Sequence, residues 1–186
     1  MFTEQFDDYA CEGETITCEK DGFTVTARIE RDDDMLPPWK EHDGHGPVSE
    51  WRPKDSKRPG ERILHEDRGS CRFYDWQEAV VIAKRDEWVW ASPPCEPRSL
   101  GQIAEHAVQR DFEHLKAWCD DKWTWCRIVL CVSKGGIEVE DYAACLGGIA
   151  LNDDDNGHLN EVANELLDEA LEAGKKAAAA MVEALS

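Results

Sequence analysis

The run Trp123–Val132 constrains the fold more than any other part of this sequence. Its apolar residues do not alternate with polar ones, so a strand formed here is apolar on both faces: Trp125, Cys126, Ile128, Val129, Leu130 and Val132. Such a strand belongs in the middle of a sheet, with cover on both sides. Gly135-Gly136 then predicts a hairpin turn into a strand that starts at Ile137 and continues towards Ile149. Gly147-Gly148 predicts a bulge or a bend within it.

A second hairpin is predicted over residues 14–30. Asp21-Gly22 is a good two-residue turn between two segments rich in β-branched residues. After this turn, Phe23, Val25, Ala27 and Ile29 alternate with polar residues. This alternation indicates a strand with one buried face and one exposed face.

Three helices are predicted from caps and spacing. Asp75 is a suitable N-cap for a helix over 76–85, and Ser99 for a longer helix of about 22 residues that reaches Asp120. A last helix carries an apolar stripe from Leu159 to Leu171, and Gly174 is a possible kink. Its alanine-rich end, 177–180, packs closely within the chain or pairs with a second copy.

The segment 31–72 is predicted to be a long irregular loop. It contains five prolines and four glycines, and few of its stretches show any periodicity. The expected fold is therefore one α+β domain over residues 1–186, with a mainly antiparallel sheet of about four strands and three helices packed on it. Along the chain, this domain begins with the hairpin at 14–30, continues with the irregular segment at 31–72 and ends with a helix-helix-hairpin-helix part at 73–186.

The net charge of −19 limits the partners of this chain. Naked nucleic acid and anionic membranes repel such a chain, whereas a basic protein surface attracts it. The excess lies in the outer thirds, because residues 1–46 have a net charge of −9, residues 47–100 of zero and residues 101–186 of −10.

Two runs of three aspartates stand out within these acidic thirds, and each follows an expected strand. They are Asp32, Asp33, Asp34 and Asp153, Asp154, Asp155. If both strands belong to one sheet, the runs lie at the same end of it and form an anion-mimicking patch. Two other interpretations stay open, namely solvated loops and a site for divalent cations, although neither run has the spacing of a calcium loop.

The densest group of metal-ligand side chains is His42, Asp43 and His45, with Glu41 beside them. Two imidazoles and a carboxylate this close are able to ligate a metal and to activate a bound water. The alternative to a metal-dependent hydrolase or nuclease is a structural loop, since Gly44 and Gly46 indicate a tight turn. We find no nucleophile motif and no phosphate-binding glycine motif.

Eight cysteines without any Cys-x-x-Cys spacing are expected to be buried free thiols. A zinc site from scattered thiols, such as Cys119 with Cys126, is the alternative. The N-terminus lacks the basic and apolar regions of a signal peptide, and no apolar run is long enough to span a membrane. We therefore expect a protein of the bacterial cytoplasm.

This chain resembles a family of small acidic proteins carried by phages and plasmids of Gram-negative bacteria. The resemblance lies in the segments 31–34, 38–51, 59–62, 74–76 and 112–119. The resemblance implies no activity and no catalytic residues. It implies a context, since small acidic proteins on mobile elements include anti-CRISPR proteins and DNA mimics that act as counter-defence factors.

From charge and resemblance together we expect a non-enzymatic inhibitor that binds a basic surface of a host nucleoprotein complex, most specifically an anti-CRISPR protein. It would bind neither membrane nor nucleic acid directly, would use no cofactor, and would be able to form a homodimer through the last helix. The expected contact residues are the two Asp runs, Trp39 as an apolar anchor, and the acids of the last helix: Glu161, Glu165 and Asp168.

Overall fold

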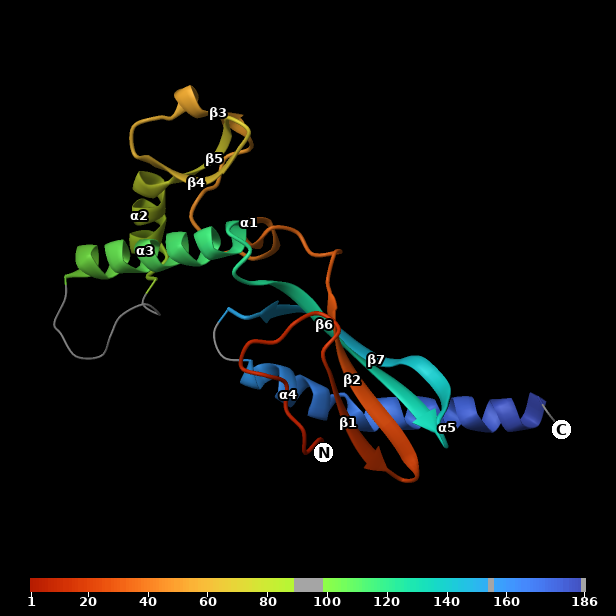
Figure 1. Cartoon of the computed structure of the whole chain (residues 1–186). Coiled ribbons are helices and arrows are strands. Elements are labelled where there is room, and N and C mark those ends of the chain that lie inside the picture. Colours follow the sequence, from red (N-terminus) through yellow and green to blue (C-terminus); the bar gives the residue numbers. More distant parts are fainter. Residues whose placement is uncertain (89–98, 154–155, 185–186) are drawn as a thin grey trace. The chain divides into compact units, whose positions relative to one another are not determined.

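The structure, a computed structural model, describes residues 1–88, 99–153 and 156–184. The chain forms two compact units (Figure 1). Unit 1 consists of Met1–Met35 and Trp123–Ser186, and unit 2 is the intervening Leu36–Lys122. The sequence predicts one domain over residues 1–186. That the two units fold and unfold together as one domain stays a prediction.

Unit 1 contains the predicted four-stranded antiparallel sheet, which confirms the α+β class. Its strand order is β1-β2-β6-β7, from β1 (Thr15–Lys20), β2 (Phe23–Arg31), β6 (Thr124–Lys134) and β7 (Ile137–Leu151). Both predicted hairpin turns are present, with φ of 56° and 75° at Asp21 and Gly22 and of 58° and 80° at Gly135 and Gly136. Two consecutive residues with positive φ match the right-handed twist of the flanking strands. The predicted bulge is present opposite Arg127, where the register shifts at Gly147-Gly148.

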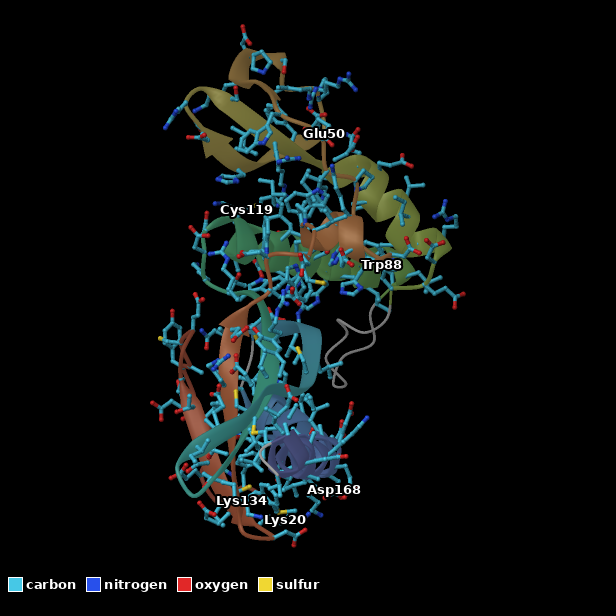
Figure 2. The ribbon with its side chains drawn as sticks, turned by 90° about the vertical axis from the view of Figure 1, so that its right-hand side faces the viewer. Lys20, Glu50, Trp88, Cys119, Lys134 and Asp168 are labelled. Atoms are coloured by element: carbon cyan, nitrogen blue, oxygen red, sulfur yellow. The ribbon has the colours of Figure 1, made fainter. Side chains whose placement is uncertain are left out.

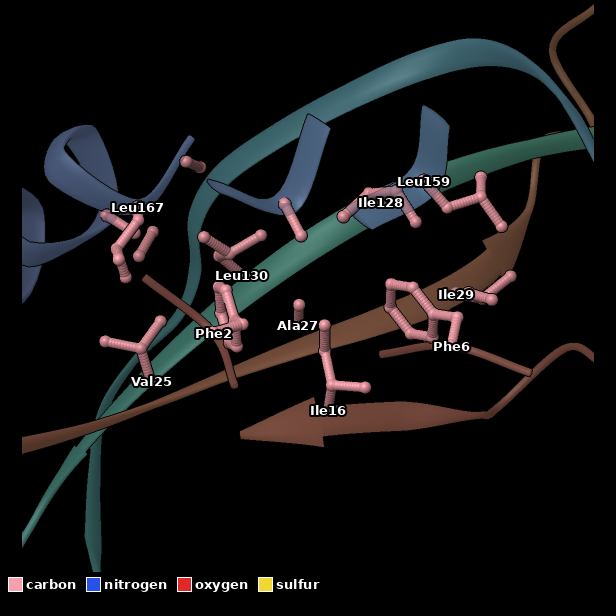
Figure 3. Close-up of a cluster of buried hydrophobic side chains, with 14 of the residues drawn as sticks. Phe2, Phe6, Ile16, Val25, Ala27, Ile29, Ile128, Leu130, Leu159 and Leu167 are labelled. Carbon is pink, nitrogen blue, oxygen red and sulfur yellow. The ribbon is translucent and has the colours of Figure 1, made fainter. Parts of the chain in front are cut away.

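Helices α4 (Gly157–Glu165) and α5 (Leu167–Ala184) pack on one face of this sheet (Figure 1). Figure 3 shows the layer between them, in which Val25, Ile29 and Leu130 of the sheet meet Leu159 and Leu167 of the helices. The predicted last helix is thus two helices that join at Leu166 rather than one helix kinked at Gly174. Gly174 has another role, because it is buried where α5 approaches Val132 of β6.

We expect Gly174→Ala to destabilise the protein by about 1–3 kcal/mol, because the added methyl group would overlap the side chain of Val132. Gly101→Ala is the matched control, since a Cβ there lies no closer than 3.9 Å to another side chain. Alanine is the better helix former, so the control is expected to be stabilising by less than about 1 kcal/mol. Urea unfolding of both variants checks the opposite signs, and equal effects would contradict the close approach.

Unit 2 contains a second, small sheet beside two longer helices, α2 and α3, and two short helical turns, α1 and η1. Its elements are α1 (Pro38–Glu41), β3 (Arg52–Pro53), η1 (Lys54–Ser56), β4 (Glu61–Asp67), β5 (Ser70–Asp75), α2 (Trp76–Arg85) and α3 (Leu100–Cys119). Both predicted caps are confirmed. The Asp75 carboxylate accepts a hydrogen bond from the backbone N–H of Glu78 at 3.0 Å, and Ser99 forms a capping box with Gln102.

The expectation of an irregular segment over 31–72 is wrong for its second half, where β4 and β5 form a hairpin. Two local features hide this hairpin from a reading of the sequence. The register shifts between Ile63 and His65, so the alternation of buried and exposed residues is broken inside β4. The turn uses Arg68, with φ of 47°, where Asn or Asp is usual.

Candidate functional site

The negative charge is concentrated in unit 1. Its 99 residues include 23 acidic and 7 basic ones, a net charge of −16. Unit 2 has 17 acidic and 14 basic residues, a net charge of −3. The excess of negative charge therefore belongs almost entirely to unit 1, which makes unit 1 the candidate for an electrostatic contact surface.

Helices α4 and α5 present a row of carboxylates to solvent, which we call the acidic stripe: Glu161, Glu165, Asp168, Glu169 and Glu172. These residues recur three or four positions apart, so they lie on one side of the helices, opposite the buried Leu159, Leu167 and Leu171. Asp168 pairs with Lys20, and Glu172 pairs with Lys175. Within the described part of the chain, the other three glutamates form no ion pair.

The Asp32–Asp34 run is placed differently from the expected patch. Asp32 is only 8% exposed. One of its oxygens lies 2.6 Å from Arg127 Nη2, and the other accepts a hydrogen bond from the Gly148 N–H at 2.9 Å. Asp32 therefore holds the bulge of β7 against the end of β2, and its carboxylate does not belong to the exposed acidic surface.

Asp33 and Asp34 are exposed but paired, with Arg31 at 2.9 Å and Arg127 at 3.0 Å respectively. Asp153 is exposed at the same end of the sheet, because the end of β2 pairs with the start of β6 and the start of β6 with the end of β7. Asp154 and Asp155 lie outside the described residues. The acidic stripe is consequently the better-defined candidate contact surface.

His45 belongs to a buried hydrogen-bond cluster in unit 2 that the sequence did not predict. Its Nδ1 lies 2.6 Å from Asp111 Oδ1, and the other oxygen of Asp111 accepts hydrogen bonds from the Gly46 N–H and the Tyr74 hydroxyl at 2.8 and 2.6 Å. Asp111 is 1% exposed and the His45 side chain is 17% exposed. Burial beside Asp111 raises the pKa of Tyr74 far above its usual range, so the hydroxyl stays protonated and donates.

The geometry does not bring His42, Asp43 and His45 together as metal ligands. His42 and Asp43 are exposed, whereas the Nδ1 of His45 is engaged by Asp111. Among the residues described by the structure, no three His, Cys, Asp or Glu side chains are grouped to hold a metal ion. His45 is thus fastened to α3 through Asp111, and a metal site in this loop stays a prediction.

Trp39 is half-buried and packs inside unit 2. Its ring lies 5.4 Å from that of Trp118 in an edge-on arrangement, and the Arg72 guanidinium is 5.5 Å from its centre. Arg72 also lies 5.0 Å from the ring of Trp51, which is 40% exposed. These contacts fasten the segment before β3 to the small sheet, and they leave Trp51 as the more exposed of the two aromatic side chains.

The cysteines that the structure describes are free thiols, and four of them are buried: Cys71, Cys119, Cys126 and Cys131. Burial raises the pKa of Cys126 to about 12 and that of Cys119 to about 11. Burial and a hydrogen bond to Asp141 raise the pKa of Cys131 to about 11. Since the thiolate is the reactive form, these side chains are inert at neutral pH.

Alkylation is expected to distinguish the thiols. Iodoacetamide at about pH 7.5 should modify the exposed Cys11 and leave Cys71, Cys119 and Cys126 intact, because these three side chains are buried and the reagent cannot reach them. Peptide mass spectrometry measures the modified fraction, and the same reaction in urea provides the control in which all eight cysteines react. Rapid modification of Cys126 in the native protein would contradict the buried position.

No protein-family model, no curated protein and no solved structure matches this chain. The resemblance to proteins of mobile elements therefore stays a hypothesis. In the ranges covered by the structure, no helix is long and apolar enough to cross a membrane.

Sequence reasoning found the acids of the last helix but missed Asp111 and Tyr74. A signal for Asp111 was present, because it lies three residues after Val108 and four before Leu115. These spacings place the carboxylate on the buried stripe of the predicted helix. A buried acid needs a partner, so this position indicated a hydrogen-bonded cluster.

Proposed function

We propose that this chain is a non-enzymatic binder of basic protein surfaces, and that unit 1 is its binding part. The observation that carries the proposal is the concentration of a net charge of −16 on unit 1, together with an exposed acidic stripe on two packed helices. Helices that are packed on a sheet hold their carboxylates in a fixed row. Such a row is complementary to lysines and arginines held in a row on a partner.

The proposed target is the nucleic-acid channel of a host defence complex in the bacterial cytoplasm. RNA-guided complexes hold their nucleic acid in positively charged channels. An acidic protein that occupies such a channel excludes DNA or RNA from it, which is the action of an anti-CRISPR protein. The resemblance to proteins of phages and plasmids favours this target over other basic proteins.

The stripe supports this proposal better than the Asp runs do. Glu161, Glu165 and Glu169 form no ion pair with any described residue, so they are available to a partner without breaking a contact inside the protein. Asp32, in contrast, is buried against Arg127. We therefore expect Asp32 to contribute to folding and the stripe to contribute to binding.

Displacement of nucleic acid tests the proposed function. A purified multi-subunit RNA-guided complex is incubated with fluorescently labelled target DNA, and the chain is titrated into the mixture. We expect the fraction of DNA that is bound to the complex to fall as the chain is added. The DNA should remain uncleaved, and the chain itself should remain chemically unchanged. Degradation of the DNA, or displacement that is equally strong with a heat-unfolded chain, would contradict specific binding by a folded surface.

A further inference from the structure

All four lysines of unit 1 lie at one end of its sheet: Lys20, Lys134, Lys175 and Lys176. Lys20 ends β1 and Lys134 ends β6, while Lys175 on α5 pairs with Asp21 in the turn between β1 and β2 at 2.9 Å. Figure 2 labels Lys20 and Lys134 near the same end of the unit. Two of these lysines pair with the acidic stripe, Lys20 with Asp168 and Lys175 with Glu172, whereas Lys134 and Lys176 form no ion pair within the described residues.

An open groove of about 430 Å³ lies among these lysines, between α5 and the ends of β2 and β6. Its lining is Phe23, Lys134, Lys175, Ala178, Ala179 and Val182. Four of the six residues are apolar, and the volume is in the range of small-molecule sites. The groove exists because α5 carries its apolar side past the end of the sheet, where Val182 is 67% exposed.

Lys134 and Lys175 differ in the charge that they offer to a ligand. Lys175 is already neutralised by Asp21 and Glu172, at 2.9 and 3.3 Å. Lys134 forms no ion pair with a carboxylate of the described residues, and its ammonium group lies 4.5 Å from the ring centre of Phe23. The groove thus combines an apolar floor with one uncompensated positive charge at its edge.

We propose that this groove binds an aliphatic carboxylate, with the hydrocarbon chain along Ala178, Ala179 and Val182 and the carboxylate on Lys134. A phosphate group alone would leave the apolar floor unfilled, and a neutral hydrocarbon would leave Lys134 unpaired. The residues that line the groove do not belong to the acidic stripe, so this site does not depend on the proposed function.

Isothermal titration calorimetry of the full chain with decanoate, below its micelle concentration, tests the site. We expect a dissociation constant of about 0.1–1 mM for an open groove of this kind. Decanol, which has the same chain without the charge, is expected to bind at least about tenfold more weakly. Equal binding of the two compounds, or no heat of binding with decanoate, would overturn the proposal.

Two pairs of variants locate the binding. Ala179→Trp fills the groove and should abolish binding, while Ala180→Trp, its exposed neighbour outside the lining, should leave it unchanged. Lys134→Met should weaken binding about tenfold, and Lys176→Met, which removes the same charge outside the groove, less than about twofold. Equal losses within either pair would overturn the assignment.

A second copy of the chain is the competing occupant, since the alanine-rich end of α5 lines the groove. Sedimentation across a range of protein concentrations distinguishes the two. If the groove binds a carboxylate, we expect the protein to be a monomer whose mass does not change when decanoate is added. A dimer that decanoate leaves intact, and that Ala179→Trp dissociates, would show that the groove is covered by a second copy and would overturn the proposal.

Discussion

Reversing the charge of Glu161, Glu165 and Glu169 should weaken binding to the basic target about 100-fold or more. These three glutamates of the acidic stripe are exposed and have no ion pair within the described residues, so their replacement by lysine removes no contact that stabilises the fold. Each lysine would face a like charge on the target, which costs free energy as well as removing an attraction. Surface plasmon resonance against the immobilised complex measures the change.

The matched control reverses three exposed glutamates of unit 2: Glu78, Glu87 and Glu105. This variant has the same net charge as the stripe variant, so non-specific electrostatic attraction is equal in the two. Thermal unfolding of both variants verifies that they remain folded. If the control loses as much affinity as the stripe variant, the net charge rather than the stripe determines binding, and the assignment of the site to α4 and α5 is wrong.

Asp111→Ala is expected to destabilise the protein by about 3–5 kcal/mol. The substitution leaves the Gly46 N–H, the Tyr74 hydroxyl and His45 Nδ1 without their common acceptor in a site where Asp111 is 1% exposed. A buried donor without a partner loses its hydrogen bonds to water without replacement. The unfavourable free energies of the three donors add up in this one cluster. Urea unfolding, followed by tryptophan fluorescence, measures the loss.

Two further variants define the origin of this effect. Glu113→Ala changes an exposed acid two residues along the same helix and is expected to leave the unfolding midpoint close to that of the wild type. His45→Ala removes only one of the three donors, so we expect a smaller loss than that of Asp111→Ala. A protein in which Asp111→Ala is as stable as Glu113→Ala would show that the loop before β3 is not held by this carboxylate.

Much of unit 1 could be predicted from the sequence because its signals are local. Asp21-Gly22 and Gly135-Gly136 are adjacent pairs of residues that accept positive φ, and each of them specifies a hairpin without knowledge of the rest of the chain. In unit 2 the caps Asp75 and Ser99 are local signals of the same kind, since each bonds to the backbone three residues later.

Unit 2 was less predictable because its order comes from contacts between distant residues. Its loop is fastened by His45 and Asp111, which are 66 positions apart, and no local pattern encodes that pairing. Its sheet includes a bulge that disrupts the alternation on which strand prediction depends. Arg72, between Trp39 and Trp51, gives order to a proline-rich segment whose composition alone indicates a loop.

The candidate site was partly predictable for a similar reason. The acids of α4 and α5 follow helical spacing, so a helical prediction already places them on one exposed face. The burial of Asp32 was not predictable from its run of three aspartates. It depends on Arg127 and on the backbone of Gly148, which come from two other strands.

The salt dependence of binding tests the central claim, that the acidic stripe of unit 1 binds a basic surface, most directly. The affinity of the wild-type chain for the purified complex is measured from about 50 to about 500 mM salt, beside that of the stripe variant. We expect a steep loss of affinity with salt for the wild type and a much smaller dependence for the stripe variant. An affinity that is unchanged by salt, and that is equal in the two proteins, would contradict it.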